Sequence, residues 1–165
     1  MVAHIHHAKK HRHTIPVHVT QFIQKNLVAV SNVSRKYGVP ASIILAQAGL
    51  ESGWGQKVEG NAYFGVKGKA PDGASVNIAT HEDTKEGHIA IHDNFRAYTS
   101  FEDAAEDYAM MLSSNPRFSH AFMFKNDPEK FAEELQRNHY ATDVNYAKKI
   151  KQVIKSFSLR QYDNP

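Results

Sequence analysis

The chain of 165 residues contains no cysteine, which excludes disulfide bonds and thiolate metal sites. It has no apolar run approaching the roughly 20 residues that a membrane-spanning helix needs. The basic N-terminal segment MVAHIHHAKKHRH is not followed by an apolar stretch, so the sequence does not predict a Sec signal peptide. We therefore expect a globular protein that is not inserted in a membrane.

An excess of basic charge is also missing from most of the chain. The formal net charge of +3 comes from Lys9, Lys10 and Arg12, which leaves 17 basic and 17 acidic side chains in the remainder. A nucleic-acid-binding domain normally carries a basic stripe on its fold. We therefore expect no nucleic-acid partner, although the cationic N-terminal segment suits an anionic target.

Residues 1–16 are predicted to form a flexible basic arm that is rich in histidine. Its histidines are His4, His6, His7, His11 and His13. Short His-rich tracts can bind metal ions, and the simpler interpretation is a solvated tail. Residues 17–165 contain no internal repeat or low-complexity linker, so we expect them to form a single domain.

The first half of the chain predicts two helices and a loop. Apolar residues recur at helical spacing over 20–37, with Thr20 as a plausible N-cap and Gly38 as a C-terminal stop. A second helix over 40–51 opens with proline and is apolar on most sides, so it should be buried. Residues 56–75 are rich in glycine and are expected to form a loop.

A β-hairpin should follow this loop. Residues 76–82 and 88–92 alternate like strands, and residues 83–87 between them are expected to turn. Three helices are then predicted over residues 100–113 (with a near capping box, Ser100 to Asp103), over residues 127–138, and from a cap at Thr142 or Asp143 to Phe157. A helical domain with one hairpin belongs to the α+β class.

Glu51 is the first candidate for chemistry, because it ends an almost wholly apolar helix. A carboxylate there is costly unless it is paired or protonated. Desolvation and the negative end of the helix dipole both raise a carboxyl pKa, as a general acid requires. The alternative is a glutamate in an ion pair across the core. Spacing alone leaves both interpretations open.

Trp54 is the only tryptophan, and it lies between Gly53 and Gly55. An aromatic ring bracketed by glycines can offer a flat face to a sugar ring. The alternative is a ring packed into the core beneath the end of the helix, which is the common use of a buried aromatic.

Several separated segments carry a family resemblance. They are AQAGLESGWG at 46–55, NAYFGVKG at 61–68, THE at 80–82, FRAYTSFEDAAEDYAMML at 95–112, NPRF at 115–118 and YATDVNYAKKI at 140–150. In this order they resemble the peptidoglycan β-N-acetylglucosaminidases of glycoside hydrolase family 73, over about residues 20–157. The resemblance implies a lysozyme-like α+β fold, mostly helical, with the hairpin beside an active-site cleft.

The resemblance also implies three catalytic residues. Glu51 lies at the position of the catalytic acid, Glu82 at that of the second carboxylate, and Tyr140 at that of a family tyrosine. The hairpin sequence is variable, so Glu86 is a rival to Glu82 and Asp83 is a weaker one.

Asn61, Phe64 and Tyr146 match further family positions and, with Trp54, are the expected substrate-binding residues. Two positions depart from the family pattern beside Tyr140. His139 replaces a usual glycine, and Val144 replaces a usual proline. The shape of this loop therefore cannot be carried over from the family.

Two mechanisms are open for such an enzyme. Glu51 donates a proton to the leaving oxygen in both. An ionised Glu82 activates water if the reaction inverts, whereas in a substrate-assisted reaction the 2-acetamido oxygen attacks and Tyr140 positions it. Neither mechanism requires a cofactor or a metal, and no H-E-x-x-H pattern predicts a zinc site.

The resemblance thus predicts an endo-β-N-acetylglucosaminidase whose partner is the peptidoglycan glycan strand. The alternatives are a muramidase, as a phage endolysin or autolysin fragment, and a non-catalytic wall-binding module. We expect delivery without a Sec signal, as an antibacterial type VI secretion effector that acts in the periplasm or cell wall of target bacteria. A cognate periplasmic immunity protein is then the expected second partner.

Overall fold

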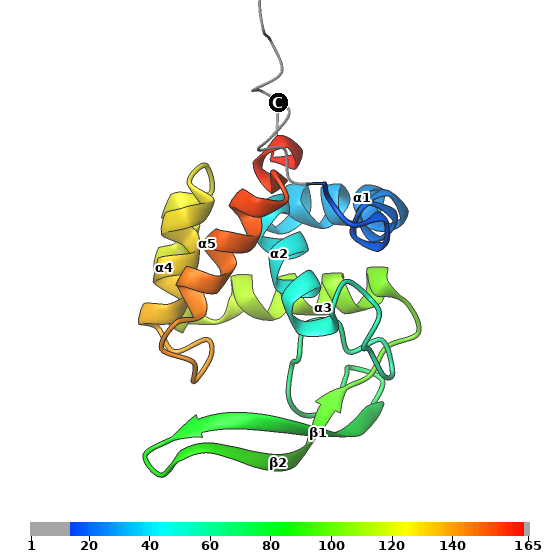
Figure 1. Cartoon of the computed structure of the whole chain (residues 1–165), viewed down its shortest axis with the longest axis vertical. Helices are drawn as coiled ribbons and strands as arrows, with labels where there is room; N and C mark the ends of the chain where they lie inside the picture. Colours follow the sequence, from blue (N-terminus) through cyan, green and yellow to red (C-terminus); the bar gives the residue numbers. More distant parts are fainter. Residues whose placement is uncertain (1–13, 164–165) are drawn as a thin grey trace, which may run out of the picture.

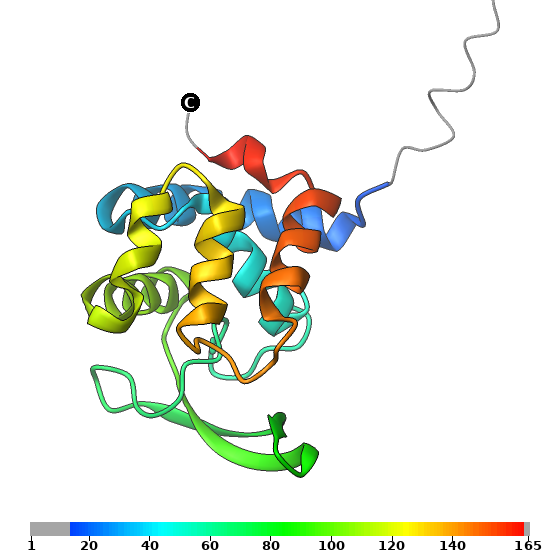
Figure 2. The ribbon, with the colours of Figure 1, turned by 90° about the vertical axis from the view of Figure 1, so that its left-hand side faces the viewer.

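The computed structural model describes residues 14–163, so part of the predicted arm, residues 1–13, lies outside the described residues. A helical body stands above a two-stranded antiparallel hairpin, which extends along one end of the molecule (Figures 1 and 2). The elements are α1 (Val17–Tyr37), α2 (Ala41–Ser52), β1 (Ser75–Thr84), β2 (Gly87–Arg96), α3 (Phe101–Ser114), the 3-10 helix η1 (Pro116–Phe124), α4 (Pro128–Arg137), α5 (Tyr146–Ser156) and the 3-10 helix η2 (Leu159–Tyr162). This arrangement confirms the predicted α+β class.

Helix α2 is the centre of the helical body, and it packs against α1, α4, α5 and η2. Its residues are buried on every side, as the apolar sequence predicted, from Ala41 through Gly49. The N-terminus is held by Asp163, whose carboxylate accepts the backbone N–H of Ser42 at 2.7 Å. Gly53 ends the helix in a left-handed conformation. Glu51 is thus carried on a rigid, fully packed support.

The hairpin is longer and its turn tighter than the sequence predicted. Strands β1 and β2 pair over ten residues each, and Thr84 pairs with Gly87 across a two-residue turn. The expected turn residues Asp83, Thr84 and Gly87 are themselves paired within the ladder. Alternation places Glu82 and Asp83 on opposite faces of the hairpin.

Three predicted caps give different outcomes. Ser100 accepts the N–H of Asp103 at 3.1 Å, which confirms the capping box of α3. The prediction of Thr20 as an N-cap is wrong, because α1 begins three residues earlier and has Pro16 at its cap. The last helix begins at Tyr146, since Asp143 turns back to accept the N–H of Asn145 in the preceding loop.

Apolar and aromatic side chains join the helices into one core. Tyr108 of α3 stacks on Phe64 with ring centroids 4.3 Å apart, and Phe101 packs edge-on against Phe22 of α1. Burial of such rings is a large favourable contribution to folding. Over residues 14–163, no helix combines the length and the apolar character that crossing a membrane would require.

Candidate active site

Glu51 lies in the last turn of α2, and its side chain is exposed to a cleft between the helical body and the hairpin. Protein atoms crowd the carboxyl on its other sides, and this desolvation raises its pKa above the usual 4.5. No hydrogen bond or ion pair joins the Glu51 carboxyl to another residue in the part of the chain that the structure describes. The structure therefore gives no support to a core ion pair and provides a carboxyl suited to proton donation.

Gly65 approaches the Glu51 carboxyl more closely than any larger residue can. A Cβ atom at Gly65 would lie 2.8 Å from Oε2 and 3.1 Å from Cδ of Glu51. The residue also has a φ of +60°, which favours glycine. Sequence reasoning singled out Phe64 and missed Gly65, although both belong to the quoted NAYFG segment.

The cleft extends to both sides of Glu51. One cavity of about 570 Å³ runs from Glu51 toward η1 and the loop 139–143, and another of about 560 Å³ runs toward the loop 56–62. Glu51, Gly65, Thr80 and Phe95 line both cavities. The carboxyl thus stands at the junction of two spaces, with room for a chain on either side.

Glu82 lines the larger cavity from strand β1. Its carboxylate forms an ion pair with Lys67, which also contacts Asp93 at 3.2 Å. The hydrogen bond to Glu82 is the main cause of a raised Lys67 pKa, so Lys67 is charged at neutral pH. Lys67 is a site residue that sequence reasoning did not single out.

The rival carboxylates of the hairpin lie elsewhere. Asp83 faces away from Glu82 and contacts Nδ1 of His88 at 2.8 Å. Glu86 is exposed in the two-residue turn. Neither of these rivals is among the residues that line the two cavities, so Glu82 is the hairpin glutamate that shares a cavity with Glu51.

Tyr140 and Tyr146 line the cavity opposite the hairpin, with ring centroids 5.5 Å apart. Burial raises the pKa of both hydroxyl groups, so both are protonated at neutral pH and can donate hydrogen bonds. Tyr146 accepts a hydrogen bond from Nε2 of Gln47 at 2.8 Å. Gln47 was not expected as a site residue, because a buried helix gave no signal for it.

The departure at His139 has a local explanation. His139 has a φ of +61°, the left-handed region in which glycine is favoured. The usual glycine of the family therefore suits this backbone, and histidine occupies the same conformation at a cost in strain.

The remaining expected substrate-binding residues divide into two groups. Phe64 is 3% exposed and lines the larger cavity while it stacks on Tyr108. Trp54 instead packs edge-on against Phe22 and Phe157, outside the lining of both cavities.

Asn61 also lies outside the cavity linings, where its amide donates to the carbonyl oxygen of Tyr98 at 2.9 Å. Trp54 and Asn61 thus support the loop after α2, whereas Phe64 and Tyr146 reach the cleft.

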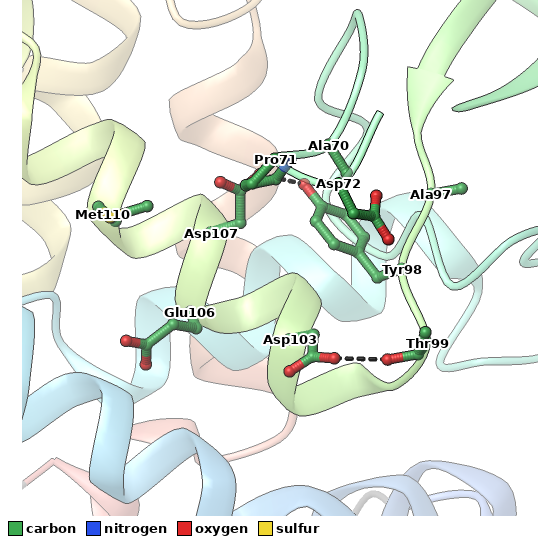
Figure 3. Close-up of a pocket in the computed structure, with 10 residues that line it drawn as sticks. All are labelled: Ala70, Pro71, Asp72, Ala97, Tyr98, Thr99, Asp103, Glu106, Asp107 and Met110. Atoms are coloured by element: carbon green, nitrogen blue, oxygen red, sulfur yellow. Dashed lines mark hydrogen bonds between the residues drawn. The ribbon is translucent and has the colours of Figure 1, made fainter. Parts of the chain in front are cut away.

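A third cavity, of about 240 Å³, lies away from Glu51 between residues 70–72, residues 97–99 and α3 (Figure 3). Its acidic side chains have partners inside the protein. Asp107 accepts from Tyr98 and from Arg96, and Asp103 accepts from Thr99. The residues around this cavity therefore join the end of the hairpin to α3 by hydrogen bonds.

No cluster of three or more histidine, aspartate or glutamate side chains that could hold a metal ion occurs among residues 14–163. The histidines of the predicted arm at positions 4, 6, 7, 11 and 13 lie outside the described residues. The chemistry that the described cleft offers is that of a raised-pKa carboxyl, a paired carboxylate and two tyrosine hydroxyls.

A helical body with a side hairpin, and an acid of raised pKa in the cleft between them, define a lysozyme-like glycoside hydrolase domain. Residues 28–159 match the glucosaminidase family model, described as mannosyl-glycoprotein endo-β-N-acetylglucosaminidase. The chain belongs to this family, glycoside hydrolase family 73.

Three comparisons illustrate the relationship. Peptidoglycan hydrolase FlgJ of Pseudomonas aeruginosa is 36% identical over 151 residues, which cover 86% of this chain and 37% of the relative. The catalytic domain of the Listeria monocytogenes autolysin Auto superposes with a TM-score of 0.76 at 31% identity, covering 94% of this chain and 93% of that domain. A type VI secretion effector–immunity complex from Pseudomonas protegens shares the fold, with a TM-score of 0.61 at 20% identity and coverage of 88% and 94%. The chain spans little more than a third of the length of the curated FlgJ relative.

Proposed function

We propose that the chain hydrolyses the glycan strand of peptidoglycan, as an endo-acting β-N-acetylglucosaminidase. The observation that carries the proposal is the Glu51 carboxyl at the junction of two cavities, which has a raised pKa and no hydrogen-bond or ion-pair partner among residues 14–163. A polymer that crosses the junction places an internal glycosidic oxygen beside the acid. Family membership supports the choice of glucosaminidase over muramidase.

Glu51, whose pKa is raised by burial, donates its proton to the leaving oxygen as the bond to the anomeric carbon breaks. Glu82, paired with Lys67 on the hairpin side of the cleft, activates a water for attack on the anomeric carbon. In the substrate-assisted route the acetamido oxygen makes that attack instead. Tyr140, protonated and facing the same cavity, then holds the acetamido group.

The test is digestion of purified sacculi by the wild-type chain, followed by turbidity and mass spectrometry of the products. We expect a loss of turbidity and new internal glycan ends. Intact sacculi after incubation with folded protein would contradict the proposal and favour a non-catalytic wall-binding module.

We further propose delivery as an antibacterial effector with a periplasmic immunity protein that covers the cleft around Glu51. The shared fold of the Pseudomonas protegens complex supports the idea at the level of architecture, and a concave site offers a partner much buried area. The test is expression with a periplasmic signal, with and without the neighbouring open reading frame. An absence of toxicity, or of rescue by a neighbour, would leave the endolysin and autolysin contexts.

A further inference from the structure

Gln47 lies in the centre of α2, one helical turn before Glu51, so the two side chains share a face of the helix. It is completely buried. A buried amide carries a donor end and an acceptor end, and both need partners. In this protein both partners are tyrosine hydroxyls.

The two tyrosines differ in their surroundings. Tyr108 donates its hydroxyl hydrogen to Oε1 of Gln47 and is itself completely buried. Tyr146 accepts from Nε2 of Gln47 at 2.8 Å and lines the cleft. Among residues 14–163, the Tyr108 hydroxyl has no second hydrogen-bond partner.

The surroundings of Tyr108 fix the direction of the amide. If the amide were reversed, Nε2 would face Tyr108, and the hydroxyl hydrogen of Tyr108 would have no acceptor inside the core. An unsatisfied buried donor is costly, so the orientation with Oε1 toward Tyr108 is favoured. The hydroxyl oxygen of Tyr146 then accepts a hydrogen bond from Nε2 of Gln47, and the hydroxyl hydrogen of Tyr146 must point away from Gln47.

We propose that Gln47 is a positioning residue that makes Tyr146 a hydrogen-bond donor to an oxygen of the glycan bound beside Glu51. The inference rests on the proposed function, because the acceptor belongs to the substrate. Hydroxyl and acetamido oxygens of the sugar are acceptors of the required kind. The hydroxyl hydrogen of Tyr146 has no acceptor on Gln47, so an oxygen of the bound substrate is its partner in the cleft.

The test is a double-mutant cycle with Gln47→Met and Tyr146→Phe, measured as kcat and KM on soluble glycan strands. Methionine keeps the length of the side chain and removes both hydrogen bonds. We expect each single variant to lose about 3- to 10-fold in kcat/KM, the worth of one hydrogen bond. In the Tyr146→Phe background, Gln47→Met should cause no further loss, because Gln47 acts through that hydroxyl.

A second variant, Gln47→Glu, separates a loss of positioning from a loss of folding. In Gln47→Glu, a protonated carboxyl offers the same donor and acceptor as the amide, whereas an ionised carboxyl offers two acceptors and turns the Tyr146 hydrogen inward. At acid pH we expect Gln47→Glu to have a kcat near that of the wild type. As pH rises, its kcat should fall more steeply than that of the wild type. This added fall should be absent when Tyr146→Phe is also present. A purely structural role of Gln47 would give neither the added fall nor its dependence on Tyr146.

Asn26→Leu is the matched control, since Asn26 is another buried amide, bonded to the carbonyl oxygen of Phe22. It should lower the melting temperature and leave kcat unchanged. Independent, additive losses for Gln47→Met and Tyr146→Phe would overturn the inference. A wild-type chain that releases no glycan ends would instead overturn the proposed function, so the two failures are distinct.

Discussion

At the scale of single residues, the proposed activity depends on the environment of one carboxyl. Glu51 has a pKa raised by desolvation and no ion-pair partner among residues 14–163. A carboxyl with a raised pKa keeps its proton to a higher pH and can donate it, and the same desolvation penalises its charged form. Function and stability therefore make opposite demands on this position.

We expect Glu51→Gln to lower the rate of glycan cleavage by about 10²- to 10⁴-fold, because glutamine cannot donate the proton. The measurement is release of reducing ends from sacculi, with circular dichroism to establish that the variant is folded. Cleavage at the wild-type rate by a folded Glu51→Gln protein would remove Glu51 from its assigned role.

The same substitution should raise stability in a defined pH range. The pKa of Glu51 in the folded state lies above its unfolded value of about 4.3, so the folded state is fully favoured below that pH and loses stability as pH rises through the folded pKa. Glutamine removes this loss. We expect a higher melting temperature for Glu51→Gln at pH 7 and no difference below about pH 4. A lower melting temperature at pH 7 would show that the ionised carboxylate stabilises the fold.

His139→Gly should raise the free energy of unfolding by up to about 1 kcal/mol, because glycine adopts the positive φ of this residue without strain. Urea denaturation measures the change. Val144→Gly is the control, since Val144 is exposed in the same loop and its φ is not positive. It should lower stability, and a stability loss in both variants would contradict the strain at His139.

At the scale of elements, the site is built where the end of α2 meets the loop 61–68 and strand β1. Apolar spacing predicted α2, alternation predicted β1 and the glycine content predicted the loop, and the single acid at the end of α2 could be found from the sequence. The contact between Gly65 and Glu51 could not be predicted from the sequence, because it joins two segments whose approach depends on the packing of Phe64 on Tyr108. The assignment of Trp54 was ambiguous for the same reason, since a ring bracketed by glycines fits a cleft or a core.

Gly65→Ala should lower kcat/KM by about tenfold or more, since a misplaced catalytic group loses much of its effect. The new methyl group would displace the Glu51 carboxyl, which lies 2.8 Å from the position of a Cβ. Gly73→Ala is the matched control, with a φ of +88° and no atom within 4 Å of a Cβ. Both variants should be less stable in urea, and only Gly65→Ala should lose activity. Equal losses of activity would assign the effect to backbone strain.

The hairpin contributes the second carboxylate, and three single substitutions can identify it. We expect Glu82→Gln to reduce the rate less than Glu51→Gln does, and Glu86→Gln to leave it unchanged, because Glu82 alone of these two lines the cleft. Initial rates on sacculi provide the measurement. A full rate for Glu82→Gln together with a loss for Glu86→Gln would show that Glu86 is the second carboxylate.

At the scale of the whole molecule, the helical body, which carries the acid, lies above the hairpin, which carries the paired carboxylate (Figure 2). Glu51 and Glu82 line one cavity between them. The 17 basic and 17 acidic side chains outside the N-terminal arm balance, so shape and hydrogen bonding dominate recognition over net charge. A cleft with space on both sides of Glu51 suits attack within a strand.

The central claim is that the chain cuts the bond on the reducing side of N-acetylglucosamine, with Glu51 as the acid. Mass spectrometry of borohydride-reduced products from digested sacculi tests this most directly, because it identifies the sugar at each new reducing end. We predict that the wild-type chain yields reduced N-acetylglucosamine ends and that Glu51→Gln yields almost none. Reduced N-acetylmuramic acid at the new ends would contradict the claim and identify the enzyme as a muramidase.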